Sequence, residues 1–257
     1  PKIARMSVDP HIVAAHCVSV IVPVGPDATQ LESALSSLRS QTWSNLEILV
    51  TSASRGAKQK AKISTLAALD PRIRIIPVKT GAPEYQARNT ALKEAKGTFV
   101  TVHQANEVSH PVRIAEQIMP LLRDYAIATV SRCVSVSAEG RFEGVWSPDF
   151  TLVFDSPTSL MAATDILREA GGWDAVATNP DAYLAWRLRK SLGKDCIQTV
   201  LPRIPAALIW QADVARGPAH LMFAYCQRPH ALRRLVRLTC PAADANVSNG
   251  ITLHAPP

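Results

Sequence analysis

Residues 18–50, VSVIVPVGPDATQLESALSSLRSQTWSNLEILV, hold two apolar runs on either side of a helical stretch. The first run, 18–24, is rich in valine and isoleucine and ends at the Gly-Pro turn of 25–26, so it predicts a buried strand. Residues 46–50 predict a second strand. Between them, residues 29–40 place apolar side chains at helical spacing: Leu31, Ala34, Leu35 and Leu38. A strand, a helix and a strand joined by short connections predict two parallel strands covered by the helix.

The same alternation continues along the chain. We expect helices over 57–69 and 84–95 and strands over 72–77 and 98–102. The first helix is expected to have Thr29 as its N-cap. Alternating strands and helices predict an α/β fold, Rossmann-like, with a mostly parallel central sheet and helices on both faces.

The pattern changes after residue 125. Residues 127–130 and 133–136 predict strands separated by polar residues, and residues 164–170 and 182–192 predict helices. Beyond about residue 205 the regular pattern weakens. We therefore expect an N-terminal extension, one α/β domain with two halves, and a basic helical segment with a tail: 1–17, 18–205 (18–107 and 108–205) and 206–257.

The composition favours a globular domain with an anionic partner. Hydrophobic residues make up 47% of the 257 residues, and the formal net charge is +7 with a pI near 9.4. A nucleotide-sugar, a nucleic acid or an acidic lipid would suit that charge. No apolar run reaches the roughly 18–20 residues needed to span a bilayer. The cysteines include no C-x-x-C pair, which argues against a zinc site or disulfide framework and favours a reducing, cytoplasmic compartment.

A basic segment at 228–238, RPHALRRLVRL, alternates arginines with apolar residues. It is expected to be either the last helix covering the domain or a surface that contacts an anionic membrane or a partner domain. Membrane contact would place the protein at the inner face of the membrane. Nucleic acid is not an expected partner, because the segment has no accompanying recognition motif or stacking aromatics.

Polar residues follow the strand predicted at 98–102. Ligands of open α/β sheets bind beyond the carboxyl ends of strands, which places His103, Gln104, Asn106 and Glu107 where a site is expected. Gln104 and Asn106 are amides at positions where an enzyme that handles phosphates would favour carboxylates.

Taken in order, these segments resemble the family 2 glycosyltransferases, which have a GT-A fold. The similar stretches are VSVIVPV (18–24), LESALSSLRSQTWSNLEILV (31–50), DPRIRIIPV (70–78), ARNTALKEAKGTFVTV (87–102), PVRIAEQ (111–117), LMAATDILREAGGWD (160–174) and PDAYLAWRLRKSLG (180–193). Together they cover residues 17–195.

The resemblance implies transfer of a sugar from a nucleotide-sugar to a saccharide or glycoconjugate acceptor by an inverting mechanism, as in polysaccharide biosynthesis. Asp181, six residues before Arg187, matches the general base. Membrane contact through residues 228–238 would suit an enzyme that uses a lipid-linked acceptor. The nucleotide-sugar-binding positions are Pro23, Val24, Gly25, Ser52, Arg88, Gln104, Ala105 and Asn106, and the acceptor-side positions are Trp173, Asp174 and Arg187.

The family's Asp-x-Asp motif is degenerate here, since Gln104 and Asn106 occupy its acidic positions. Amide oxygens carry no formal charge to offset Mg²⁺ or Mn²⁺. Three outcomes remain open: Glu107 holds the metal with the substrate's phosphates, Arg88 or Arg187 balances the diphosphate, or the chain is an inactive binding or scaffolding domain.

Each candidate also has an ordinary structural explanation. Asp181 could cap a helix, Arg88 could form a surface ion pair, His103 could be a packed histidine and Glu107 could be solvated. Tyr183 and Trp186 are expected to line the core or the acceptor groove.

Overall fold

The computed structural model describes residues 9–25, 28–137, 142–143, 153–176, 179–202 and 204–210. The predicted basic segment 228–238 and Pro26 lie outside these residues, so the structure does not test those predictions.

The first half of the chain forms the predicted alternation. Its elements are α1 (Pro10–Ala15), β1 (Val18–Val24), α2 (Leu31–Arg39), β2 (Leu46–Ser52), α3 (Ala57–Ala67), β3 (Ile73–Pro77), α4 (Glu84–Glu94) and β4 (Phe99–Val102). The strands β3, β2, β1 and β4 lie side by side in that order, and all of their pairings are parallel. The carboxyl ends of β1, β2 and β4 therefore meet at one edge of the sheet.

The second half extends the same sheet with both antiparallel and parallel pairings. Its elements are β5 (Glu107–Ser109), α5 (Arg113–Leu122), β6 (Ala128–Val136), β7 (Phe142–Glu143), β8 (Phe154–Ala163), α6 (Thr164–Glu169), α7 (Pro180–Leu192), β9 (Ile197–Val200) and β10 (Ala207–Trp210). The order continues from β4 through β8, β6 and β10 to β5, with β7 and β9 also paired to β6. Because β8 runs antiparallel to β4 and β6, the sheet is mixed but mostly parallel, and the predicted α/β fold is confirmed.

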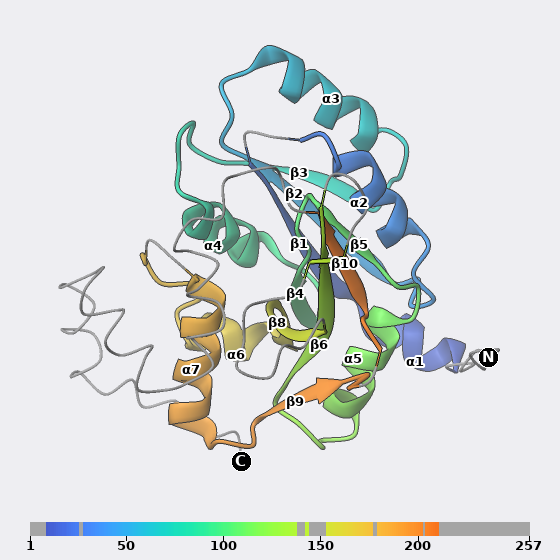
Figure 1. Cartoon of the computed structure of the whole chain (residues 1–257), viewed down its shortest axis with the longest axis vertical. Coiled ribbons are helices and arrows are strands. Elements are labelled where there is room, and N and C mark those ends of the chain that lie inside the picture. The colour runs from blue at the N-terminus through green and yellow to red at the C-terminus, as the bar shows by residue number, and fades with distance from the viewer. Residues whose placement is uncertain are drawn as a thin grey trace.

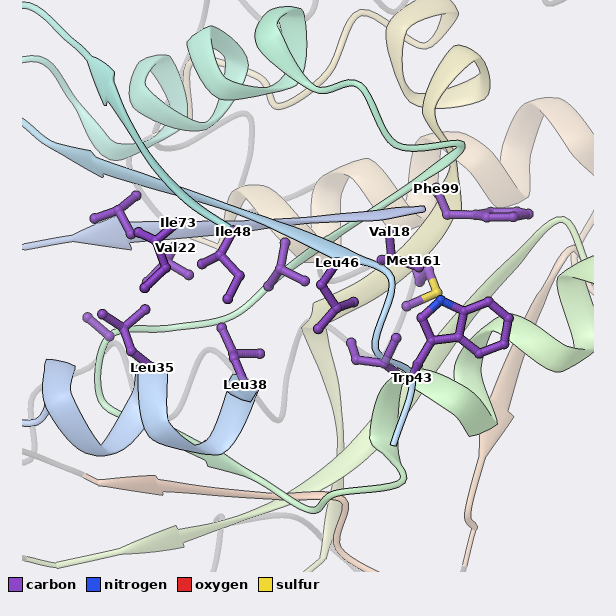
Figure 2. Close-up of a cluster of buried hydrophobic side chains, with 14 of the residues drawn as sticks. Val18, Val22, Leu35, Leu38, Trp43, Leu46, Ile48, Ile73, Phe99 and Met161 are labelled. Atoms are coloured by element: carbon purple, nitrogen blue, oxygen red, sulfur yellow. The ribbon is translucent and has the colours of Figure 1, made fainter. Parts of the chain in front are cut away.

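Two apolar layers hold helices on both faces of the sheet (Figure 1). One layer packs α2, α3 and α5 against the strands, and the other packs α4, α6 and α7. Figure 2 shows Leu35 and Leu38 of α2 directed toward Val22 and Ile48 in the first layer. Each fully buried side chain of this kind contributes about 1.5–3 kcal/mol.

The start of α2 differs from the prediction in one detail. The cap position is Gln30, without a side-chain cap hydrogen bond, so Thr29 is not the N-cap. The Leu31 N–H instead donates to the Ala28 carbonyl at 3.3 Å, which places a turn before the helix. The predicted apolar stripe is nonetheless buried: Leu31, Ala34, Leu35 and Leu38.

The two strands predicted at 127–130 and 133–136 are one strand, β6. Ser131, the polar residue that suggested a break, is buried, and its N–H donates to Ser159 Oγ at 2.8 Å. This bond satisfies the Ser131 backbone N–H inside the sheet, while the Ser131 hydroxyl is buried with no hydrogen-bond partner among the described residues. Neither β8, whose stretch 154–163 mixes proline and hydroxyl residues, nor α5 was expected from the sequence. The cysteines in the described part of the chain, Cys17, Cys133 and Cys196, are free thiols.

Candidate active site

Asp181 lies in the first turn of α7 with its side chain directed inward. The cap of this helix is Asn179, whose Oδ1 accepts from the Ala182 N–H at 3.2 Å, so the expectation that Asp181 is the cap is wrong. Asp181 Oδ1 accepts from Arg88 Nη1 at 2.5 Å and from Trp173 Nε1 at 2.8 Å. Its Oδ2 accepts from Thr158 Oγ1 at 3.0 Å.

Arg88 of α4 is buried and pairs with two carboxylates. Its Nη1 binds Asp181, and its Nη2 binds Glu84 one turn earlier on the same helix. Burial acts to lower the pKa of Arg88, but the charges of Asp181 and Glu84 raise it overall, so the guanidinium stays charged. Its Nε is buried with no hydrogen-bond partner among the described residues. Arg88 is thus a buried part of the site and not a surface ion pair.

The strand tip after β4 divides its contacts between two neighbours. Gln104 Nε2 donates to Thr158 Oγ1 at 3.3 Å, so Gln104 and Asp181 meet at the same hydroxyl. Asn106 Nδ2 donates to the Trp210 carbonyl at 2.6 Å, and the Trp210 N–H donates to the Asn106 carbonyl at 2.9 Å. The structure therefore brings Gln104 to Asp181 and fixes Asn106 to β10.

Glu107 is enclosed within the protein, so the expectation that it is solvated is wrong. Its Oε1 accepts from Arg113 Nη1 at 2.9 Å and from Ser109 Oγ at 3.0 Å, and its Oε2 accepts from the Gln104 N–H at 3.3 Å. Burial acts to raise the pKa of Glu107, but His103, Arg113 and the hydrogen bonds hold it below its usual value.

His103 is fully buried beside this pair. Its Nδ1 lies 2.9 Å from the Gln104 carbonyl oxygen, and its Nε2 lies 3.4 Å from Ser37 Oγ. Burial is the main cause that lowers the pKa of His103 to about 4, with Glu107 opposing that shift. The ring is neutral at physiological pH, which agrees with the packed histidine that the sequence allowed.

The side chains at the strand tip do not fit a divalent metal. Gln104 and Asn106 supply neutral amides that are already hydrogen-bonded, and the Glu107 carboxylate is neutralised by Arg113. In the part of the chain that the structure describes, no group of three or more His, Cys, Asp or Glu residues could hold an ion. Mg²⁺ and Mn²⁺ prefer carboxylate oxygens.

Of the residues predicted on the acceptor side, Trp173 and Asp174 lie in the turn after α6, and Arg187 of α7 binds this turn. Arg187 Nε lies 2.8 Å from Asp174 Oδ2 as an ion pair without hydrogen-bond alignment, and the Arg187 Nη groups donate to the Ala170 and Gly172 carbonyls. Burial raises the pKa of Asp174 despite Arg187. Arg187 therefore holds this turn against α7.

Trp173 joins the same turn to α4 and to Asp181. Asn89 Oδ1 accepts from the Trp173 N–H at 2.9 Å, and Asn89 Nδ2 donates to the Trp173 carbonyl at 2.8 Å. The Trp173 ring, which donates to Asp181, is buried. Trp173 is thus one of the residues that hold the Asp181 carboxylate in place.

The remaining predicted residues lie at the carboxyl edge of the parallel strands. Pro23 and Val24 pair with Thr51 and Ser52 at the ends of β1 and β2, and Gly25 follows directly. The Gly25 carbonyl accepts from Gln59 Nε2 at 2.5 Å, and the hydroxyl of Ser52 accepts from the Ser54 N–H at 3.3 Å. Ala105, at the strand tip, is buried.

Two residues of the candidate site were not predicted from the sequence. Arg113 supplies the charge that neutralises Glu107, and Thr158 joins Gln104 to Asp181. An arginine six residues after a glutamate predicts a buried ion pair only when both side chains are known to face the core. Thr158 lies in β8, which carried no readable strand pattern.

Fold and site together define a GT-A-type α/β domain with a buried aspartate linked, through Thr158, to the strand tip after β4. The chain belongs to glycosyl transferase family 2, whose family model matches residues 19–166, more than half of its length. The resemblance seen in the sequence is thereby confirmed.

Curated relatives cover parts of the chain. It is 28% identical over 109 residues to WfgD of Escherichia coli, the UDP-Glc:alpha-D-GlcNAc-diphosphoundecaprenol beta-1,3-glucosyltransferase. It is 26% identical over 137 residues to the protein y4gI of Sinorhizobium fredii (strain NBRC 101917 / NGR234). These matches span 42% and 52% of this chain but only 42% and 15% of the relatives, respectively.

Solved structures share the fold. The mannosyltransferase PcManGT from Pyrobaculum calidifontis, in complex with GDP-Man and Mn²⁺, has a TM-score of 0.60 at 17% identity over 93% of this chain and 76% of its own. TarS 1-349 of S. aureus, in complex with UDP-GlcNAc, has a TM-score of 0.59 at 15% identity over 85% and 65%. Among the described residues, no helix is long and apolar enough to cross a membrane.

Proposed function

We propose that this domain transfers a sugar from a nucleotide-sugar to a saccharide or glycoconjugate acceptor by an inverting mechanism, with Asp181 as the general base. The acceptor hydroxyl must lose a proton as it attacks the anomeric carbon, and a carboxylate within hydrogen-bond reach can accept it. Family membership and the nucleotide-sugar named for WfgD support this activity.

The observation that carries the proposal is the meeting of Gln104 and Asp181 at one hydroxyl. It joins the strand tip, where the donor is expected, to the carboxylate expected to serve the acceptor. A carboxylate oxygen has two lone-pair positions, and in the described part of the chain Asp181 Oδ2 receives only the Thr158 hydroxyl. One position on Oδ2 is therefore free for a substrate proton.

The donor is proposed to lie along the carboxyl edge of the sheet. Its nucleotide would contact the ends of β1, β2 and β4 and Arg88, at Pro23, Val24, Gly25, Ser52, Gln104, Ala105 and Asn106. The acceptor would lie on the side of Trp173, Asp174 and Arg187. In the proposed division, residues 18–107 form the donor half of the domain and residues 108–205 the acceptor half.

Donor binding is proposed to be independent of a divalent metal. The strand tip offers amides, and Glu107 is already paired with Arg113. Arg88, next to Asp181, is the predicted cation nearest the proposed reaction and would balance part of the diphosphate charge. Arg187 is the other candidate for that role. Both guanidinium groups are already engaged, Arg88 with Asp181 and Glu84, and Arg187 with Asp174 and two backbone carbonyls.

The acceptor is proposed to be a saccharide that can be lipid-linked, since WfgD is named for a diphosphoundecaprenol acceptor. Such a reaction would place the domain in the cytoplasm at the inner face of the membrane. The basic segment 228–238 is the proposed contact with that membrane or with a partner domain.

Calorimetric titration with UDP-glucose, UDP-GlcNAc and GDP-mannose, with and without Mn²⁺, tests the donor site, and nucleotide release in the presence of a GlcNAc-diphospho-lipid tests transfer. We expect binding that does not change when Mn²⁺ is removed, together with release of UDP or GDP. Binding that requires Mn²⁺ would overturn the metal-independent site. Absence of both binding and release with every donor would overturn the enzymatic proposal.

A second candidate is a binding or scaffolding domain that has lost metal and nucleotide binding. It is favoured by the enclosed Glu107–Arg113 pair and by the two amides at the strand tip. The double change Gln104→Asp with Asn106→Asp separates the two candidates. Metal-dependent nucleotide affinity in this variant indicates that the strand tip still faces the donor phosphates, and its absence favours the scaffolding domain.

A further inference from the structure

Strand β8 departs from regular pairing at one place. Opposite β6, Met161 pairs with Thr129 and Ser156 pairs with Ser131, so residues 157–160 lie opposite Val130 alone. Such a bulge bends a strand and redirects its side chains, and bulges are enriched beside active sites. Thr158 lies within this bulge, after Pro157, whose missing N–H is tolerated where the ladder is interrupted.

The bulge is fixed by hydrogen bonds through the neighbouring Ser159. The Ser159 hydroxyl accepts from the Ser131 N–H at 2.8 Å and donates to the Ser156 carbonyl at 2.7 Å. The Ser159 carbonyl accepts from Thr101 Oγ1 at 3.0 Å and from Gln117 Nε2 at 2.7 Å. Thr158 is therefore held in place by a rigid stretch of backbone.

The direction of each hydrogen bond at Thr158 follows from its partners. An ionised carboxylate only accepts, so the single hydroxyl hydrogen of Thr158 goes to Asp181 Oδ2. The same oxygen can then only accept, and Gln104 must present its Nε2 to it. Thr158, which is 4% exposed, thus links the two sides of the proposed site through one buried oxygen.

We propose that Thr158 is a positioning residue that sets the orientation of the Asp181 carboxylate. This inference rests on the proposed function. Arg88 and Trp173 hold Oδ1, while in the described residues Thr158 is the donor to Oδ2. Without the hydroxyl, only the two bonds to Oδ1 restrain the turn of the carboxylate about its Cβ–Cγ bond, so the direction of Oδ2 is less tightly fixed. The Gln104 amide loses its anchor at the same time.

Thr158→Val tests the role because it removes the hydroxyl and keeps the shape of the side chain. We expect kcat to fall about 10- to 100-fold, as for a misplaced catalytic group, with a smaller rise in the donor KM because Gln104 also loses its anchor. Thr158→Ser keeps the hydroxyl and is expected to retain at least about half of kcat. The assay follows UDP or GDP release from UDP-glucose, UDP-GlcNAc and GDP-mannose with a GlcNAc-diphospho-lipid acceptor.

Thr164→Val is the matched control. Thr164 is also buried, lies directly after β8 and donates its hydroxyl hydrogen to the Gly97 carbonyl at 2.5 Å, away from Asp181. It carries the same chemical change and is expected to keep the wild-type kcat.

The outcomes separate this inference from the proposed function. Release by the wild type together with equal kcat for Thr158→Val and Thr164→Val overturns the positioning role and leaves Asp181 as the base. A loss in Thr158→Val that Thr158→Ser does not restore also overturns it, since packing alone would then explain the loss. A wild type that releases nucleotide from none of the donors overturns the proposed function and the positioning role together.

Discussion

Glu107 and Asp181 are both buried carboxylates paired with an arginine, but the two ion pairs differ in what surrounds them. Arg113, the partner of Glu107, uses all of its nitrogens: Nε binds Gln117, and the Nη groups bind Glu107, Ser109, Thr101 and the Val102 carbonyl. Arg88, the partner of Asp181, has no Nε partner within the described part of the chain and reaches Glu84, whose side chain is 58% exposed.

The Glu107–Arg113 pair is enclosed in the fold, whereas the Asp181–Arg88 pair is connected to the surface through hydrogen bonds. Both charged side chains of the Glu107–Arg113 pair are enclosed, at 1% and 0% exposure, and the pair connects β4, β5 and α5. Around Asp181 the network continues through Thr158 to the half-buried Gln104 and through Arg88 to Glu84. A buried pair of a carboxylate and an arginine therefore stabilises the fold in one place and forms part of the candidate site in the other.

The most direct way to break the comparison is Asp181→Asn. If Asp181 is the base, nucleotide release per folded molecule should fall about 10²- to 10⁴-fold, the usual contribution of a general base. Asp195→Asn changes an exposed aspartate after the same helix and should keep the wild-type rate. An Asp181→Asn protein that retains more than a tenth of the activity would remove Asp181 from the reaction.

Arg113→Met tests the structural pair. It leaves Glu107 buried without its counter-charge, so we expect the free energy of unfolding to fall by about 3–5 kcal/mol. Urea unfolding at pH 7 measures the loss. Arg123→Met, at the exposed end of α5, is the control and should change stability by no more than about 0.5 kcal/mol. Equal effects of the two changes would show that the Glu107 pair contributes little.

The pH dependence of stability sharpens the same contrast. The unfolded chain binds a proton at His103 near pH 6.5, whereas the folded protein does so only near pH 4. Unfolding therefore takes up a proton in this window, and His103 should destabilise the fold by about 3 kcal/mol as the pH falls from 6.5 to 4. Glu107, whose pKa is held below 4.5, adds its own loss only at the lower end.

Urea unfolding of the wild type and of His103→Gln across this range measures the effect. The variant should lose less stability than the wild type between pH 6.5 and 4. Parallel curves for the two proteins would mean that the buried ring is not the group responsible.

The smallest expected effect tests the turn that supports Asp181 through Trp173. Gly171 and Gly172 have φ of 80° and 69°, but only at Gly172 would an added Cβ meet another atom, lying 2.3 Å from Asn89 Oδ1. We expect Gly171→Ala to cost about 1 kcal/mol of stability from backbone strain, and Gly172→Ala about 2–3 kcal/mol because a clash is added. Thermal or urea unfolding that finds equal costs would contradict the close packing of Asn89 against this turn.

The sequence was most informative over the first part of the chain, where strands and helices alternate regularly. The periodic residues of α2 and the β-branched runs of β1 and β2 predicted those elements closely, because their apolar faces depend on local spacing. It was least informative over β8, where polar residues and Pro157 hide a strand that is completed by its neighbours. The division of β6 into two strands failed because the polar Ser131 is buried within one continuous strand, where its backbone N–H donates to a hydroxyl of β8.

The sequence by itself determined the α/β class, the family and the retained aspartate, because these follow from order, spacing and residue type. Only the tertiary structure decided which charges meet. It enclosed Glu107 with Arg113, and it joined Asp181 to Arg88 and, through Thr158, to Gln104. Arg88 and Asp181 lie 93 positions apart in the chain, Thr158 and Asp181 lie 23 apart, and Gln104 and Thr158 lie 54 apart. Electrostatic and hydrogen-bond energies depend on distance in space, and in a mixed sheet that distance is set by strand order and not by position in the chain.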